Sequence, residues 1–119
     1  MILVSMCLIG INCNYKGESK PNQKVIELVK MGKAIPVCPE QLGGLPTPRV
    51  ACHIKGDRVI GKDGKDYTED YKRGAELTLE IAKMFGIKKA YLKRNSPSCG
   101  KGGITRKLLE ENGIKVYEI

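Results

Sequence analysis

The sequence lacks tryptophan and contains a single phenylalanine, so aliphatic side chains must fill most of its core. It also lacks internal repeats, low-complexity tracts and any linker long enough to separate two folding units. At 119 residues and 41% hydrophobic content, the chain can build one ordinary core. We therefore expect one domain that covers residues 1–119.

Charged side chains are absent from residues 1–15, and Lys16 is the first charged residue of the chain. The apolar start MILVSMCLIGINC has no positive region ahead of it, which a signal peptide would have, and it is too short to span a bilayer. A buried first strand explains it better. We expect a cytoplasmic protein without a membrane partner.

Cysteines are present in an odd number, at positions 7, 13, 38, 52 and 99, and no Cys-x-x-Cys pair occurs among them. An odd count in an intracellular chain argues against a disulfide scaffold and for thiols that pack, react or bind metal. A structural zinc site usually needs four ligands and often paired cysteines, which are missing here. His53 is the only histidine, and we expect it on the surface or in a loop.

The net charge is +8, from 21 basic and 13 acidic residues. This excess favours anionic partners such as nucleotides, nucleic acid or anionic membranes. The lysines are spread along the chain, however, and a well-solvated lysine-rich surface explains them equally well.

Four short apolar runs predict buried strands, at residues 2–5, 34–37, 90–92 and 114–117. Helices are predicted between them at about 21–31, from Thr68 to about Gly86, and at about 105–112, with Pro21 in the first turn of the first helix and Thr68 as the N-cap of the second. Alternating strands and helices imply a parallel sheet with right-handed crossovers. The predicted fold class is α/β, a compact three-layer Rossmann-like domain with a mainly parallel four-stranded sheet and flanking helices.

Residues 51–67 interrupt this alternation. The segment DRVIGKDGKDYT has a β-like run on each side of Asp63-Gly64, which is a hairpin signal. We expect a small β-hairpin insertion beside the main sheet.

Three of the cysteines follow predicted strands: Cys7 the first, Cys38 the second and Cys99 the third. Ligands of open parallel sheets bind at the carboxyl ends of the strands, so these thiols are predicted to converge. Thiolates suit zinc or iron–sulfur clusters, and three scattered cysteines without an evident fourth ligand favour a cubane cluster with one open iron. Packing of free cysteines in the core is the alternative explanation for each. Cys13 is close enough in sequence to be a spare ligand.

Polar residues near these cysteines complete a candidate site. Glu40, two residues beyond Cys38, could activate water, or could cap backbone amides at the surface. Ser96 and Ser98 could donate hydrogen bonds to substrate or cluster sulfur, or could cap a turn. In GGLPTPR, Gly43 and Gly44 permit close approach of a ligand, while Arg49 could hold a phosphate or a base carbonyl, or form a surface salt bridge.

The motifs LVSMCLIG, PVCPEQLGGLPTPR, DGKDYTEDYKRGAE and LKRNSPSCG, in this order, resemble those of the small TudS-like thiouracil desulfurases. The resemblance covers nearly the whole chain. It implies an oxygen-sensitive [4Fe–4S] cluster held by Cys7, Cys38 and Cys99. It also implies Glu40 as the catalytic carboxylate and Ser96 as the catalytic serine, with Ser98 the weaker candidate.

The activity that the resemblance implies is the non-redox desulfuration of thiolated uracil bases or nucleotides, in which the open iron takes the sulfur and water replaces it. We expect a small-molecule substrate, no stable complex with nucleic acid, and a monomer or homodimer. The chain departs from the family at Asn14-Tyr15-Lys16-Gly17, where members commonly carry Arg-Tyr-Asp-Gly, so Lys16 points to a different substrate preference, such as a phosphorylated one. The segment after Cys99 is also shorter than in many relatives.

Two other functions compete with this interpretation. The first is an iron–sulfur carrier that transfers electrons or sulfur to a partner without hydrolysis. Four-cysteine ligation, for which Cys13 is a candidate fourth ligand, would support it, because a closed cluster lacks an open iron. An RNA-binding module with structural cysteines would be expected to carry arginine-rich or aromatic-interleaved stretches, and none is present.

Overall fold

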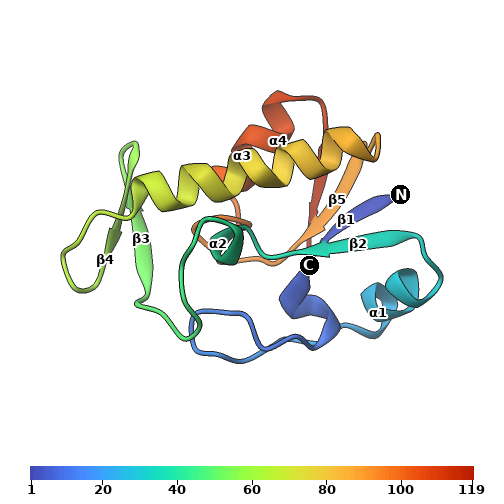
Figure 1. Cartoon of the computed structure of the whole chain (residues 1–119), viewed down its shortest axis with the longest axis horizontal. Coiled ribbons are helices and arrows are strands. Elements are labelled where there is room, and N and C mark those ends of the chain that lie inside the picture. Colours follow the sequence, from blue (N-terminus) through green and yellow to red (C-terminus); the bar gives the residue numbers. More distant parts are fainter.

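A computed structural model describes all residues, 1–119, and contains a four-stranded parallel sheet with the strand order β2-β1-β5-β6 (Figure 1). The strands are β1 (Ile2–Ser5), β2 (Ala34–Val37), β5 (Lys89–Leu92) and β6 (Lys115–Glu118). All four lie within one residue of their predicted positions. Pro36 is tolerated because β2 is an edge strand, where a missing backbone donor costs no ladder hydrogen bond.

Helices cover both faces of this sheet. The long α3 (Thr68–Met84) and α4 (Ile104–Glu111) pack on one face, whereas α1 (Gln23–Lys30) and the 3-10 helix η1 (Met6–Ile9) lie on the other (Figure 1). A short helix, α2 (Pro39–Leu42), follows β2 directly. The predicted α/β class and sheet are confirmed. None of the helices has the length and apolar content that crossing a membrane requires.

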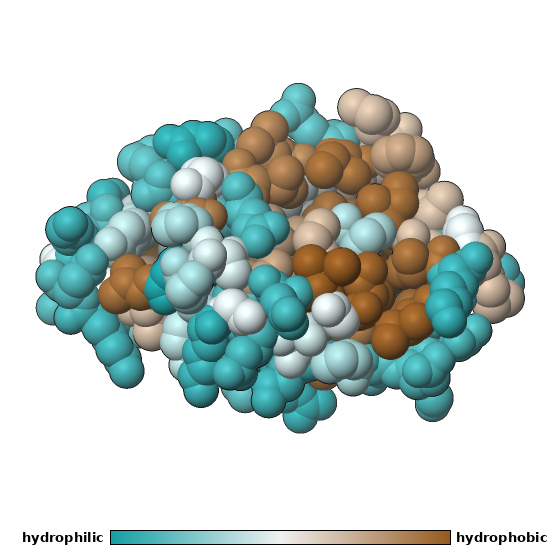
Figure 2. All heavy atoms as spheres, turned by 60° about the horizontal axis from the view of Figure 1, so that its bottom comes forward, coloured by the Kyte–Doolittle hydropathy of each residue, from teal (hydrophilic) through white to brown (hydrophobic).

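Successive residues of β1 point to opposite faces and enter two separate core clusters. Leu3 belongs to the cluster under α3 and α4, together with Ala82, Leu92 and Leu109. Val4 belongs to the cluster under α1 and η1, where half-buried apolar side chains such as Ile9 also pack. On the molecular face that Figure 2 turns forward, a hydrophobic area is visible between hydrophilic margins.

The hairpin insertion is confirmed, but its predicted turn is wrong. β3 (Cys52–Lys55) and β4 (Arg58–Gly61) pair through Lys55 and Arg58, so the tight turn is at Gly56-Asp57. The Asp63-Gly64 turn closes only an isolated bridge between Ile60 and Asp66. Each of the two turns contains a glycine at positive φ, so the local signal did not distinguish them.

Two predicted helix starts also differ from the structure. α1 begins at Gln23 rather than at Pro21, because the side chain of Asn22 caps the helix by accepting hydrogen bonds from the Lys24 and Val25 amides. Thr68 is buried inside α3 rather than at its N-cap, and its hydroxyl accepts the Val59 amide at 2.8 Å. A tertiary contact with the hairpin thus uses the side chain that the sequence pattern assigned to a cap.

Candidate active site

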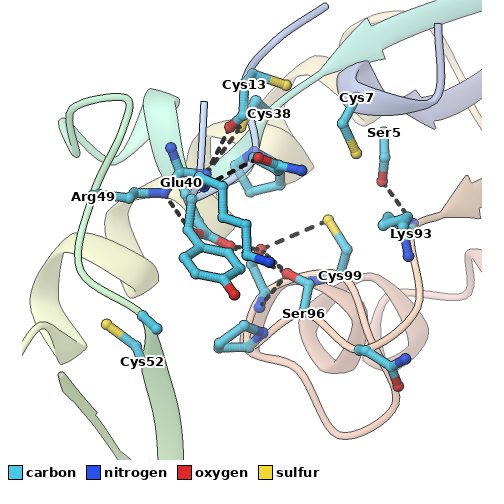
Figure 3. Close-up of a pocket in the computed structure, with 18 of the residues that line it drawn as sticks. Ser5, Cys7, Cys13, Cys38, Glu40, Arg49, Cys52, Lys93, Ser96 and Cys99 are labelled. Carbon is cyan, nitrogen blue, oxygen red and sulfur yellow. Dashed lines mark hydrogen bonds and ion pairs between the residues drawn. The ribbon is translucent and has the colours of Figure 1, made fainter. Parts of the chain in front are cut away.

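A cavity of about 510 Å³ opens at the carboxyl edge of the parallel sheet (Figure 3). Residues that follow β1, β2 and β5 line it, and residues from the 13–20 and 49–52 segments close its other sides. Its volume is in the range that small-molecule sites occupy. The edge is the one at which open parallel sheets bind ligands.

The three strand-end cysteines converge in this cavity, as the sequence predicts. Cys7 lies just after β1, Cys38 directly follows β2, and Cys99 lies in the loop after β5. All three are buried, and the Cys7 and Cys99 side chains extend into the same space in Figure 3.

A fourth buried thiol, Cys13, lines the same cavity and is only 1% exposed. The Cys38 thiol lies 3.7 Å from the Cys13 carbonyl oxygen, to which it donates a weak hydrogen bond. Cys52, on β3, is half-buried and borders the cavity away from the other four (Figure 3). The sequence offered only the proximity of Cys13 to Cys7 as a signal.

Two of these thiols ionise more readily than an ordinary cysteine. Hydrogen bonding with the Cys13 thiol lowers the pKa of Cys38 to about 6, against the opposing effect of burial. The same Cys13 thiol lowers the pKa of Cys7. Burial instead raises the pKa of Cys99 to about 12, so a metal that binds there must displace its proton.

The donor set fits an iron–sulfur cluster better than a single metal ion. Thiolates suit zinc and iron–sulfur centres, and no histidine lines the cavity. No three Cys, His, Asp or Glu side chains are close enough to hold one ion. In a tetrahedral zinc site the sulfurs would be roughly 3.8 Å apart. A four-iron cluster is larger and accommodates more widely spaced thiolates.

The Glu40 side chain is buried in the wall of the cavity, where four donors bind its two oxygens. Oε1 accepts hydrogen bonds from Arg49 Nε at 2.7 Å and from the Tyr71 hydroxyl at 3.1 Å. Oε2 accepts from Ser98 Oγ at 2.9 Å and from Ser96 Oγ at 3.2 Å. Glu40 is therefore neither exposed nor a cap of backbone amides.

The two serines have different surroundings. Ser96 is half-buried, and its Oγ also accepts the backbone amides of Ser98 and Cys99, each at 3.2 Å. Ser98 is 2% exposed, and its Oγ lies 3.7 Å from Cys99 Sγ. Ser96 thus combines the turn-capping role with contact to Glu40, and Ser98 connects Glu40 to Cys99.

Arg49 neither forms a surface salt bridge nor offers a free guanidinium to an anion. Its side chain is 4% exposed and forms an ion pair with Glu40. Burial by itself lowers the pKa of the guanidinium, but the charge and the hydrogen bond of the Glu40 carboxylate raise it. The net shift of the pKa is upwards, so Arg49 remains charged. Tyr71, a residue of α3, remains a hydroxyl donor because burial strongly raises its pKa.

Lys16 lines the cavity, but Gly43 and Gly44 do not. Gly43 lies against the backbone of α3, where a β-carbon would overlap the Asp70 carbonyl oxygen. Gly44 has a positive φ at the turn after α2 and lies near the Arg73 side chain. Packing of α2 on α3 therefore explains the glycine pair, in place of the predicted close approach of a ligand.

Further cations that the sequence analysis did not select surround the cavity: Lys20, Lys62, Lys93 and Arg94. Lys93 and Arg94 follow β5 directly, so the strand-end rule that identified the cysteines could have identified them as well. Lys62 comes from the hairpin insertion, and no local sequence signal places it at the site.

Comparisons with known proteins agree with this geometry. Residues 2–118 match the family model described as 2-thiouracil desulfurase. The uncharacterized protein YbbK of Bacillus subtilis (strain 168) is 38% identical over 141 residues, which cover 98% of this chain and 93% of YbbK. Among solved structures, the [4Fe-4S]-dependent thiouracil desulfidase TudS matches with a TM-score of 0.94 and 39% identity, over 98% of this chain and 89% of that one.

Proposed function

We propose, from the premise that this chain belongs to the 2-thiouracil desulfurase family, that it removes sulfur from thiolated uracil bases or nucleotides without redox chemistry, water supplying the replacing oxygen. The family that the sequence motifs indicate is confirmed by the match over residues 2–118. One observation carries the proposal. Three thiols from separate strand ends share a cavity with a buried carboxylate.

Cys7, Cys38 and Cys99 would hold a [4Fe–4S] cluster, the cofactor named for the matched TudS structure. When bound, such a cluster supplies an iron without a protein ligand, a thiophilic Lewis acid for the sulfur of the substrate.

Glu40 is the group that takes a proton from the attacking water. Its Oε1 is held by Arg49 and Tyr71, so only Oε2 faces the serines. Ser96, the more exposed of the two serines, relays the proton from the cavity to Oε2 through its hydroxyl. A positioned acid or base of this kind typically contributes about 10²- to 10⁴-fold to the rate.

The cations around the cavity would hold the anionic part of a nucleotide substrate. Lys16, Lys20 and Lys62 are exposed at its margin, and no ion pair neutralises them. Lys16 occupies the position at which the family resemblance leads us to expect an acidic residue. This arrangement favours a phosphorylated thiouridine over the free base.

Anaerobic reconstitution tests the proposal. Reconstituted wild-type protein should contain about four irons and four acid-labile sulfides per chain, as a [4Fe–4S] cluster requires, and should convert thiouracil or its nucleotide to the oxygen analogue with release of sulfide. Cys7→Ser, Cys38→Ser and Cys99→Ser should lose cluster and activity together. Glu40→Gln should keep the cluster and lower turnover by about 10²- to 10⁴-fold, to a residual rate that is still measurable. A fully loaded wild-type protein that releases no sulfide from any thiolated uracil compound would refute the proposal.

The buried position of Cys13 specifically favours one alternative, an iron–sulfur carrier with a closed cluster. Cys13→Ser separates the two functions. Retained cluster and retained desulfuration support the desulfurase, whereas loss of the cluster from Cys13→Ser, with no turnover in the wild type, supports the carrier.

A further inference from the structure

The guanidinium of Arg49 is fully engaged by the protein. Its Nε donates to Glu40 Oε1 at 2.7 Å, and its Nη1 donates to the Pro46 carbonyl at 3.1 Å and to Thr47 Oγ1 at 2.9 Å. Nη2 donates to the Cys13 carbonyl at 2.8 Å and lies 4.0 Å from Cys38 Sγ. Each of the five N–H groups thus has an acceptor within the chain, and none is left to bind a ligand.

These acceptors belong to separate segments of the site. Glu40 is on α2, Cys13 is in the segment after η1, and Pro46 and Thr47 precede Arg49 itself. The Cys13 carbonyl accepts from the Cys38 thiol as well as from Arg49. Arg49 therefore connects the carboxylate directly to the segment that adjoins Cys38.

The same contacts determine how the carboxylate is turned. Arg49 and Tyr71 occupy Oε1, so Oε2 is directed at Ser96 and Ser98. Without Arg49, only Tyr71 would bind Oε1, and the Glu40 carboxylate could rotate away from the serines. A shift of about 1 Å in a catalytic group can lower a rate by roughly 100-fold.

We propose that Arg49 is a positioning residue, which fixes the orientation of Glu40 relative to the Cys13 and Cys38 segment and does not bind substrate. The inference rests on the proposed function, because that function makes Glu40 the proton acceptor. Lysine cannot replace arginine here, since one ammonium group cannot reach acceptors that diverge from a planar fork.

A double-mutant cycle tests the catalytic part. Arg49→Lys should lower kcat roughly tenfold to a hundredfold, leave KM within about twofold, and retain the iron and sulfide content of the wild type. Combined with Glu40→Gln, the same substitution should cause no further loss, because Arg49 acts through Glu40. A rise in KM as the main effect, or an equal loss of kcat in both backgrounds, would overturn the inference.

A second measurement needs neither cluster nor activity. In cluster-free protein, the ¹⁵N-detected Nε–H signal of Arg49 should exchange slowly with water and should shift in Glu40→Gln. Arg58 is the matched control, because its Nε donates to Asp66 at 2.9 Å but its side chain is 45% exposed. The Nε–H signal of Arg58 should exchange rapidly with water and should not shift in Glu40→Gln. Arg58→Lys should leave kcat unchanged.

The two measurements separate two kinds of failure. A rapidly exchanging Arg49 signal that does not respond to Glu40→Gln overturns the inference even if the enzyme is active. A protected, responsive Arg49 signal in a protein that desulfurates nothing overturns the proposed function instead.

Discussion

At the scale of single residues, Ser96 and Ser98 both bind Glu40 but differ in what else they hold. The Ser96 hydroxyl caps the turn that carries Cys99, by accepting the amides of residues 98 and 99. Ser98 makes the shorter bond to Glu40 Oε2, at 2.9 Å, and a longer contact to Cys99 Sγ, at 3.7 Å. Their hydroxyls also lie 3.0 Å apart. Substitution of each serine should therefore have a different result.

Ser98→Ala should lower kcat about tenfold at unchanged cluster content, because one hydrogen bond to Glu40 is lost and the turn is kept. Ser96→Ala should lower both kcat and the iron bound per chain, because the turn that presents Cys99 loses its cap. Iron and sulfide analysis beside steady-state kinetics checks this, with Ser19→Ala, outside the cavity lining, as the control. Equal iron loss in both variants would contradict the division of roles.

At the scale of elements, α2 is held against α3 through two glycines. A β-carbon at Gly43 would overlap the Asp70 carbonyl oxygen, and one at Gly74 would overlap the Pro39 carbonyl oxygen. The backbones of the two helices are therefore in direct contact, and this contact sets the position of Glu40 in the first turn of α2.

Gly74→Ala should move α2 and so reduce both stability and activity. In an exposed helix the change would gain about 1 kcal/mol of helix propensity, but here overpacking should cost roughly 1–3 kcal/mol and outweigh that gain. Urea unfolding and kcat measure the two effects. Lys72→Ala, on the exposed side of the same helix, is the control and should change neither by much. A Gly74→Ala protein that is more stable and fully active would show that the contact does not matter.

In the hairpin insertion, the contacts of Asp66 with Thr68 and Arg58 should depend on pH. Hydrogen bonds from Thr68, together with that from Arg58, lower the pKa of Asp66 to about 2. Because the folded value is below the ordinary one, the stabilisation is present above about pH 4 and is lost as the pH falls towards 2. Amide shifts of Val59 and Thr68 should therefore change between pH 4 and pH 2. In Asp66→Asn this step should disappear, and its persistence there would assign it to another group.

The sheet and its helices could be predicted because apolar periodicity extends over whole strands and helices, and because glycines such as Gly86 and Gly113 mark their ends. The four-residue helices η1 and α2 could not, because one turn is too short to show a period. Thr68 carries a cap signal that a tertiary contact with the hairpin overrides, whereas the signal at Asp63-Gly64 did not distinguish its turn from the one at Gly56-Asp57.

The residues of the candidate site also divide into those that the sequence could predict and those that it could not. Cys7, Cys38, Cys99 and Glu40 follow strands, so the topology alone brings them to one edge. Arg49 and Tyr71 reach Glu40 across 9 and 31 residues, from a loop and from the first turn of α3. Only the packing of α2 on α3 brings Tyr71 there, and no spacing rule encodes it.

At the scale of the whole molecule, the net charge of +8 is not distributed uniformly with respect to the site. Once the Arg49–Glu40 pair is set aside, the cavity is lined by five cations and one anion: Lys16, Lys20, Lys62, Lys93, Arg94 and Glu18. A cleft of one sign concentrates ligands of the other sign, and salt screens this attraction.

Salt should therefore distinguish substrates by their charge. For a thiolated uridine monophosphate, kcat/KM should fall severalfold between about 0.05 and 0.5 M NaCl, because the Debye length shortens from roughly 14 Å to 4 Å. For uncharged thiouracil it should hardly change. Lys16→Glu should raise KM for the nucleotide alone, whereas Lys24→Glu, on the exposed part of α1 and outside the cavity lining, should leave both substrates unaffected. The same salt dependence for base and nucleotide would mean that these cations serve solubility and not recognition.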